Sequence, residues 1–169
     1  VGSEMCIRDS NRIKVRFFGG FEINKLNLNN ENLVKAAYAT SSTMGGEILA
    51  DSDKVPSFLV WAQRDKNGAP LQRVQIIKGS INQFDSTPTE VIYDVVCSNG
   101  LEVDPTTNRC PDNGARVDIE TCAFSKDKGS AELKATWTDP DFNAKDRAFY
   151  YVRVLENPTC RWSTWDALR

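Results

Sequence analysis

The sequence contains no histidine, no long apolar run and no surplus of either charge. Histidine is the commonest general base and metal ligand, so its absence excludes a histidine-dependent triad or metal centre built from this chain alone. The longest apolar runs, such as residues 58–62, are far shorter than the ~20 residues that cross a bilayer. The balance of 21 basic and 23 acidic residues argues against a surface that binds nucleic acid. We therefore expect neither a membrane nor a nucleic acid as a partner.

The first ten residues, VGSEMCIRDS, resemble translated sequencing adapter. The DNA string GTG GGC TCG GAG ATG TGT ATA AGA GAC AG, which is similar to the end left by a transposase-based library preparation, encodes Val1 to Asp9 and starts the codon of Ser10. We expect residues 1–10 to have no fold. Residues 11–169 are then expected to form a single β-rich domain, a fragment cut at both ends, with a formal net charge of −1.

Four cysteines remain once Cys6 is set aside with the adapter-like stretch: Cys97, Cys110, Cys122 and Cys160. Their even number, irregular spacing and lack of a Cys-x-x-Cys pair favour disulfides over free thiols or a zinc site. Four cysteines allow three connectivities, of which we prefer Cys97 with Cys110 and Cys122 with Cys160. Disulfides are typical of oxidising compartments, so the sequence favours a periplasmic or extracellular location.

Alternating apolar residues predict about seven short strands. They lie near residues 13–17, 58–62, 74–77, 91–95, 117–124, 133–137 and 149–155. Gly19-Gly20 is expected to interrupt the first strand as a bend. Asn67-Gly68 is a strong turn signal, which predicts a hairpin between the second and third strands. Residues 33–40 fit either a helical turn or a strand.

Short strands without a long helix predict a mainly β protein, an antiparallel β-sandwich of immunoglobulin-like type that is incomplete at both ends. Asp139, Asp141 and Asp146 could supply oxygen ligands to calcium. Their spacing does not match an EF-hand, however, and Asp-Pro-Asp is ordinary turn chemistry, so a solvated turn is preferred. Ser41 and Ser42 have no histidine partner, so we assign no catalytic residue.

Three tryptophans, Trp61, Trp162 and Trp165, are candidate ligand contacts. The flat rings of Trp162 and Trp165 could form a platform for a sugar or another flat ligand. The simpler alternative is that Trp162 and Trp165 pack against the end of the sandwich or against sequence outside this chain.

Four phrases carry a family resemblance: RIKVRFFGGF at 12–21, PSFLVWA at 56–62, QIIKG at 75–79 and RAFYYVRVLENPTCRW at 147–162. Together they resemble the C-terminal part of the bacterial domain-of-unknown-function family 3604. The resemblance spans residues 11–169, and the last phrase is the most specific.

That family is similar to the polymerase and histidinol phosphatase superfamily, which hydrolyses phosphoesters with divalent metals held by His, Asp and Glu. A metal-bound water with a lowered pKa attacks the substrate there. The resemblance places those ligands in an N-terminal barrel, so no catalytic residue, metal ligand or cofactor is assigned to this chain, while the parent protein would hold divalent metal ions.

Two hypotheses about function follow from the resemblance. In the preferred one, this is the non-catalytic C-terminal β-domain of a metal-dependent, phosphoesterase-like hydrolase, and its partner is the missing N-terminal barrel, whose cleft it helps to shape. In the alternative, it is an independent ligand- or carbohydrate-binding β-sandwich module that uses Trp61, Trp162 and Trp165.

Overall fold

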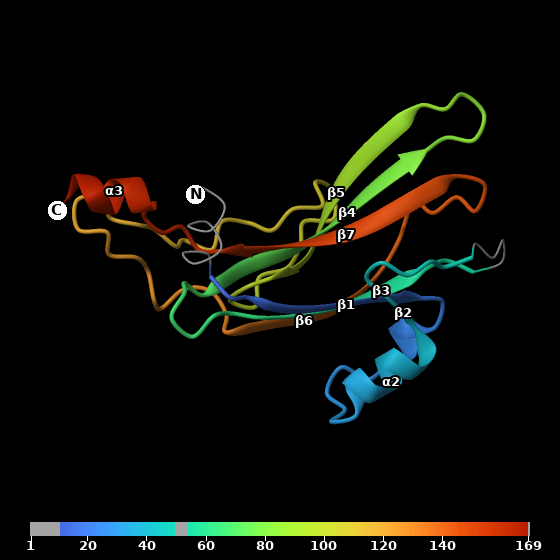
Figure 1. Ribbon diagram of the computed structural model, residues 1–169, viewed down its shortest axis with the longest axis horizontal. Coiled ribbons are helices and arrows are strands. Elements are labelled where there is room, and N and C mark those ends of the chain that lie inside the picture. The colour runs from blue at the N-terminus through green and yellow to red at the C-terminus, as the bar shows by residue number, and fades with distance from the viewer. Residues whose placement is uncertain (1–10, 50–53, 169) are drawn as a thin grey trace, which may run out of the picture.

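The computed structural model describes residues 11–49 and 54–168, which form seven strands and three short helices (Figure 1). The strands are β1 (Lys14–Gly20), β2 (Ser42–Thr43), β3 (Ser57–Gln63), β4 (Leu71–Ile81), β5 (Pro88–Cys97), β6 (Glu132–Thr138) and β7 (Arg147–Glu156). The helices are η1 (Ile23–Lys25), α2 (Leu33–Thr40) and α3 (Trp162–Ala167). The prediction for residues 1–10 lies outside the described residues.

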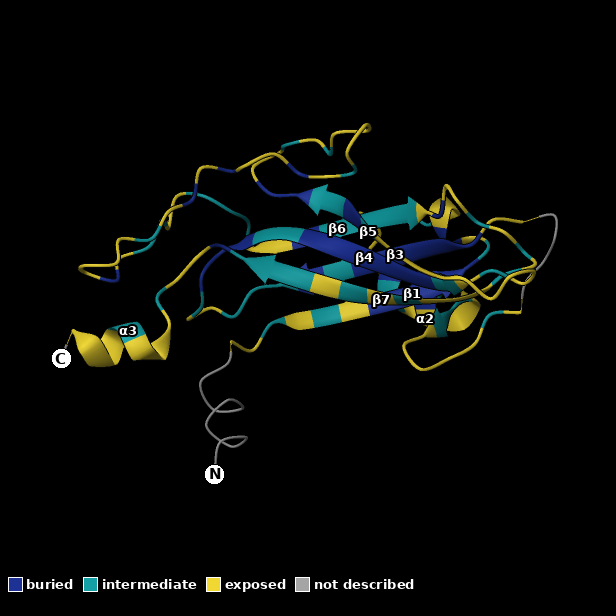
Figure 2. Ribbon diagram, turned by 90° about the horizontal axis from the view of Figure 1, so that it is seen from above, coloured by how far each residue is buried: buried dark blue, intermediate teal, exposed yellow. Residues whose placement is uncertain are grey.

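The strands make two antiparallel sheets that pack face to face, so the predicted β-sandwich is confirmed. The first sheet has the order β2-β1-β3-β6 and the second has the order β5-β4-β7. Their facing sides form the main core, in which buried residues of β1 and β3 meet buried residues of β4. Figure 2 shows burial concentrated in the middle of the strands, whereas α3 is exposed along most of its length.

A second, smaller apolar cluster covers the outer face of the first sheet. Phe18 and Leu59 pair across β1 and β3 and point away from the main core. Leu33 and Ala37, one helical turn apart on α2, are buried against them. The segment that the sequence left open between helix and strand is therefore a helix, and burial of its i, i+4 pair accounts for its position.

The predicted hairpin between residues 58–62 and 74–77 is wrong. The turn itself forms, with the amide of Gly68 donating to the carbonyl of Asp65 at 3.0 Å. The chain then crosses to the other sheet, since β3 pairs with β1 and β6 while β4 pairs with β5 and β7. Seven residues separate the two strands, more than a tight hairpin uses, and Pro70 has no amide hydrogen to extend a ladder.

Two further expectations about strands are also corrected. Gly19 and Gly20 continue β1 and pair with Phe58 and Ser57. A Cβ at Gly19 would lie 2.8 Å from Cδ1 of Ile48, so glycine here permits close packing and does not break the strand. Residues 117–124 form only one isolated bridge, because Asp118 and Thr121 close a side-chain-bonded turn between its ends.

Candidate functional site

A cavity of about 610 Å³ opens at the end of the sandwich where β1 ends and β7 begins. Its walls come from the end of β1, from residues 42–49 and from the start of β7, which are distant in sequence. The size is within the range of small-molecule pockets. Six of its lining residues are aromatic: Phe17, Phe21, Phe58, Phe142, Phe149 and Tyr150.

Three of these rings form a continuous wall between the sheets. The ring centroids of Phe17 and Phe58 are 5.5 Å apart and nearly parallel. Those of Phe58 and Tyr150 are 4.4 Å apart and tilted by 40°. Such offset and tilted arrangements are the favourable ones for aromatic pairs. The wall is thus held by ring packing from both sheets.

Next to this wall, a buried ion pair joins β4 to the turn between β6 and β7. Nζ of Lys78 lies 2.6 Å from Oδ2 of Asp139, and both side chains are almost fully buried. The same ammonium donates to the carbonyl oxygen of Asp141 at 2.7 Å. A buried charge is costly unless it is paired and hydrogen-bonded, and this one is both. The pair therefore fixes the turn against the second sheet.

Two tyrosines complete the network around Lys78. The hydroxyl of Tyr150 donates to Oδ2 of Asp139, and that of Tyr93 donates to Oδ2 of Asp141, each at 2.6 Å. Burial, followed by these hydrogen bonds to carboxylates, raises the pKa of both tyrosines far above its usual range. Tyr150 is held by its hydroxyl as well as its ring, so this part of the cavity wall is rigid.

The three aspartates considered for calcium have other partners. Asp139 pairs with Lys78 and also accepts the amide of Asp141 at 3.0 Å, which is the turn chemistry expected for Asp-Pro-Asp. The expectation of a solvated turn is wrong for Asp139, because its side chain is buried by this ion pair. Oδ1 of Asp146 accepts the amide of Gln83 at 3.2 Å. Across residues 11–49 and 54–168, no group of three or more Cys, Asp or Glu side chains is placed to hold a metal ion.

Among the residues that line the cavity, acidic side chains outnumber basic ones. Glu47 and Asp146 contribute carboxylates, and Arg147 is the one cationic residue that lines the cavity in the described part of the chain. Ser42 donates its hydroxyl to the carbonyl of Glu47 at 3.0 Å, which fixes the backbone of this segment. The lining thus combines aromatic walls with a net negative charge.

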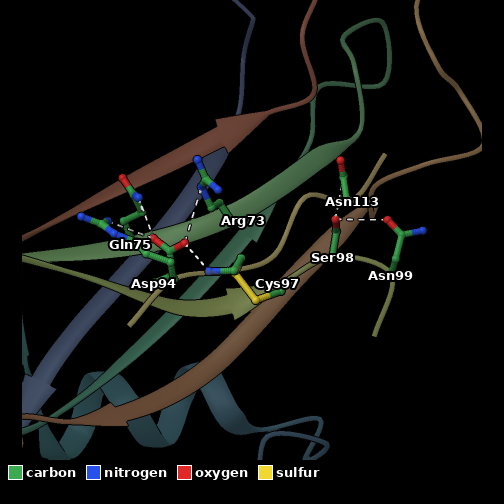
Figure 3. Close-up of a disulfide and its surroundings, with 9 residues drawn as sticks. Arg73, Gln75, Asp94, Cys97, Ser98, Asn99 and Asn113 are labelled. Atoms are coloured by element: carbon green, nitrogen blue, oxygen red, sulfur yellow. Dashed lines mark hydrogen bonds and ion pairs between the residues drawn. A yellow bond between two sulfur atoms is a disulfide. The ribbon is translucent and has the colours of Figure 1, made fainter. Parts of the chain in front are cut away.

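The opposite end of the sandwich is closed by covalent links. Cys97 is joined to Cys110 and Cys122 to Cys160, so the two expected disulfides are present and have the preferred pairing. Beside the first disulfide, the buried carboxylate of Asp94 accepts the amide of Cys110 at 2.7 Å (Figure 3).

Two arginines and a glutamine surround the same carboxylate. Gln75 donates to Asp94 at 2.6 Å, and the guanidinium groups of Arg73 and Arg109 lie 3.7 and 3.5 Å from its oxygens. These partners balance the negative charge of the buried Asp94 carboxylate. The carboxylate also links the loop that carries Arg109 to the outer face of β4 and β5.

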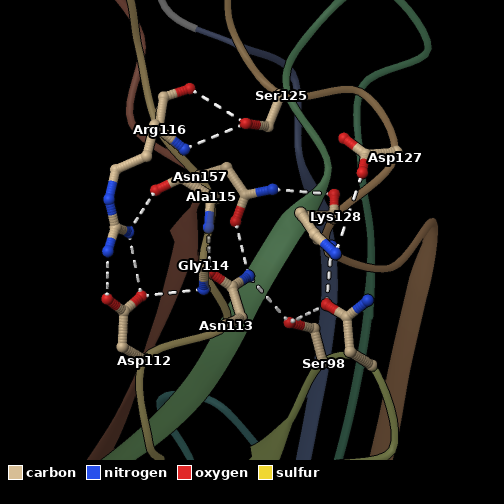
Figure 4. A network of polar contacts seen from close by, with 12 residues as sticks. Ser98, Asp112, Asn113, Gly114, Ala115, Arg116, Ser125, Asp127, Lys128 and Asn157 are labelled. Atoms are coloured by element: carbon tan, nitrogen blue, oxygen red, sulfur yellow. Dashed lines mark hydrogen bonds and ion pairs between the residues drawn. The ribbon is translucent and has the colours of Figure 1, made fainter.

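A polar network anchors the irregular segment between β5 and β6 (Figure 4). The amide nitrogen of Asn113 donates to Oγ of Ser98 at 3.1 Å and to Oδ1 of Asn157 at 2.8 Å. Asn157 in turn donates to the carbonyl of Lys128 at 2.8 Å. Because this segment has almost no regular backbone pairing, buried amide side chains satisfy groups that a sheet would otherwise satisfy.

Comparison with known proteins gives one result. Residues 8–169 match the family described as "Protein of unknown function (DUF3604)". The chain belongs to this family. The match begins within the adapter-like stretch and covers all of the described residues. No curated protein and no solved structure matched the chain.

In this DUF3604 chain the three candidate tryptophans lie on two elements, α3 and β3. Trp162 and Trp165 are on α3, 66% and 44% exposed. Trp61 is on the outer face of β3, with Nζ of Lys134 4.8 Å and Cζ of Arg16 5.8 Å from its ring centroid. Both distances fit cation–π contacts. Trp61 packs on the small apolar cluster beneath α2, apart from the two tryptophans of α3. As ligand contacts they stay predictions.

Sequence reasoning missed the cavity and the network beside it. One signal was present: Lys78 follows Val74 and Ile76 at inward positions of an alternating strand, where an apolar residue is expected. A lysine in that position predicts a buried carboxylate partner but does not say where in the sequence the partner lies.

No helix among residues 11–49 and 54–168 is long and apolar enough to span a bilayer.

Proposed function

We propose that this chain is the non-catalytic C-terminal β-domain of a metal-dependent, phosphoesterase-like hydrolase. It packs on the N-terminal barrel of the same protein and helps to shape the cleft in which that barrel would hold divalent metal ions. The two disulfides support a periplasmic or extracellular location for the whole protein.

The observation that carries this proposal is an aromatic strip on the outer face of the second sheet. Phe149 and Tyr151 of β7 are stacked, with centroids 6.3 Å apart and planes 14° from parallel, yet they are 60% and 40% exposed. Phe149 also lies over Gly79 of β4, where an added Cβ would meet its ring at 2.2 Å. Tyr151 and Ile77 are paired across the same two strands.

The first sheet differs, because η1 and α2 cover the apolar residues on its outer face. Adjacent exposed aromatic side chains on a rigid strand are typical of interaction surfaces. This difference between the outer faces suggests that a separate part of the protein covers the aromatic strip on the second sheet. The family resemblance supplies the occupant that we propose, the N-terminal barrel.

The test needs the full-length parent gene. We expect its upstream segment to contain clustered His, Asp and Glu, and the whole protein to hydrolyse p-nitrophenyl phosphate only with added divalent metal. Tyr151→Glu should lower this activity and release the β-domain to limited proteolysis. Ile119→Glu, at a residue 70% exposed in the disulfide-linked segment, is the matched control and should do neither. An upstream segment without such a cluster, or identical behaviour of both variants, would contradict the proposal.

The second candidate function, an independent ligand-binding module, is favoured by the cavity at the open end of the sandwich. All of the named lining residues belong to this chain, and the buried ones, among them Phe17 and Phe58, are part of its own core. Saturable binding of a small molecule by the 169-residue chain alone would support it.

A further inference from the structure

The second candidate function, ligand binding in the cavity, does not yet name a class of ligand. We propose that it binds a small organic cation, an aryl- or alkylammonium group, with the cation against the aromatic walls and near Glu47 and Asp146. This inference rests on the second candidate function and is independent of the hydrolase role.

The aromatic walls of the cavity favour a cation. The faces of aromatic rings carry partial negative charge, so several rings around one space attract a cation, most strongly where water is excluded. Phe58 is 3% exposed and packs between Phe17 and Tyr150, and Tyr150 is fixed through Asp139, so the rings of the wall are held in place before any ligand arrives. A preformed wall lowers the entropy lost on binding.

Hydrogen bonding argues against a sugar at the bottom of the cavity. Phe17, Phe58 and Pro56 have no polar side-chain atoms, and the hydroxyl of Tyr150 already donates to Asp139. Sugar hydroxyls buried there would lose water without gaining partners, at about 1–3 kcal/mol each. A methylated or aryl-substituted ammonium group has an apolar surface and loses much less.

The charged lining residues also favour a cation, independently of the aromatic rings. Glu47 and Asp146 outnumber Arg147, and no carboxylate among the described residues lies within salt-bridge distance of the Arg147 guanidinium. The lining therefore has a net charge of −1, which attracts a monocation and repels an anion. Arg147 opposes the cation, so its removal should strengthen binding.

The experiment titrates the 169-residue chain by calorimetry with three probes that share a phenyl ring and differ in charge: benzyltrimethylammonium, benzyl alcohol and phenylacetate. We expect one site, with the cation bound at least about tenfold more tightly than the other two. Glu47→Gln should weaken binding of the cation about threefold to tenfold, and Arg147→Gln should strengthen it, while benzyl alcohol is unaffected by either. Glu120→Gln, in the disulfide-linked segment, is the matched control for charge.

A second variant tests the position of the site. Ala148 lines the cavity from an exposed place on β7, so Ala148→Trp should block binding of all three probes without disturbing the core. Ala131→Trp, exposed and outside the cavity lining, is its control, and thermal melts check that both variants fold. Equal or tighter binding of phenylacetate, or benzyl alcohol bound as well as the cation, would overturn the ligand class alone. No binding of any probe, or binding that survives Ala148→Trp, would overturn the site itself.

Discussion

The two ends of the sandwich are held in place by different interactions. At one end, residues 98–131 have almost no regular structure and are held by two disulfides, by the carboxylate of Asp94 and by the amide of Asn113. At the other end, the sheets separate around a cavity whose wall is fixed by packed rings and by a buried ion pair, Lys78 with Asp139.

The disulfides at one end and the ion pair at the other have different physical effects. A disulfide acts mainly by restricting the unfolded chain, so it stabilises a segment that has little core of its own. A buried ion pair contributes little net stability compared with apolar residues, but it fixes geometry, because its partners must stay together. The covalent end is thus held for stability and the open end for shape. Three predictions test this contrast.

The largest effect is expected from removing the longer disulfide. Cys122→Ser with Cys160→Ser opens a link with a sequence separation of 38, for which the chain-entropy relation gives a loss of about 4 kcal/mol. This loss applies to global unfolding, and a further loss of protection is expected in the segment that the disulfide links. In hydrogen exchange, amides of residues 98–131 should lose more protection than those of β3 and of the cavity wall, which should lose only what global unfolding loses.

The shorter disulfide provides the internal comparison. Cys97→Ser with Cys110→Ser opens a separation of 13 and should cost about 3 kcal/mol by the same relation. Urea unfolding measures both variants. A loss of exchange protection shared equally by the two ends would contradict the idea that the ends are stabilised independently.

The next effect concerns the ion pair. Asp139→Ala leaves the ammonium of Lys78 buried without its carboxylate, which should cost about 3–5 kcal/mol in the free energy of unfolding. Adding Lys78→Met should recover much of that stability, because the second change removes the uncompensated charge. Ligand binding by the double variant should stay weak if the pair is there to position Tyr150.

A different result would break the comparison between the ends. If the double variant bound benzyltrimethylammonium as well as the original chain, the ion pair would serve no positioning role. The exposed pair of Arg116 with Asp112 is a suitable control, since removing it should leave both stability and binding nearly unchanged.

Sequence patterns predicted the parts of the fold that depend on local alternation. The strands β1, β5, β6 and β7 were found because inward and outward residues alternate regularly along them. The β3–β4 hairpin was wrong for the opposite reason. An Asn-Gly turn reverses the chain, but which sheet the next strand joins depends on distant partners, here β5 and β7.

The site was much harder to predict than the fold. Its walls bring together Gly19, Ile48 and Ala148, which no local pattern connects. The aspartates of the turn after β6 were recognised, but as solvated turn residues. Only Asp139 is deeply buried, because Lys78 reaches it from the other sheet. The cysteine pairing was easier, since few alternatives exist and one pair spans a short turn-rich loop.

The smallest expected effect is a pH dependence confined to the open end. In the folded chain the pKa of Tyr150 is raised above its usual value of 10.0 by burial and by Asp139, while Tyr93, Lys78 and Asp141 also face this network. Above pH 10 the unfolded chain therefore loses a tyrosine proton that the folded chain keeps, so stability falls as pH rises, by ~1.4 kcal/mol per pH unit for this group. Tyr150→Phe should remove that part of the slope in urea unfolding between pH 10 and 11.5, whereas Tyr38→Phe, at a ring 60% exposed, should keep it. Equal slopes in both variants would mean that the hydroxyl of Tyr150 is not held by Asp139 in solution, and the cavity wall would then lack the rigidity that distinguishes this end.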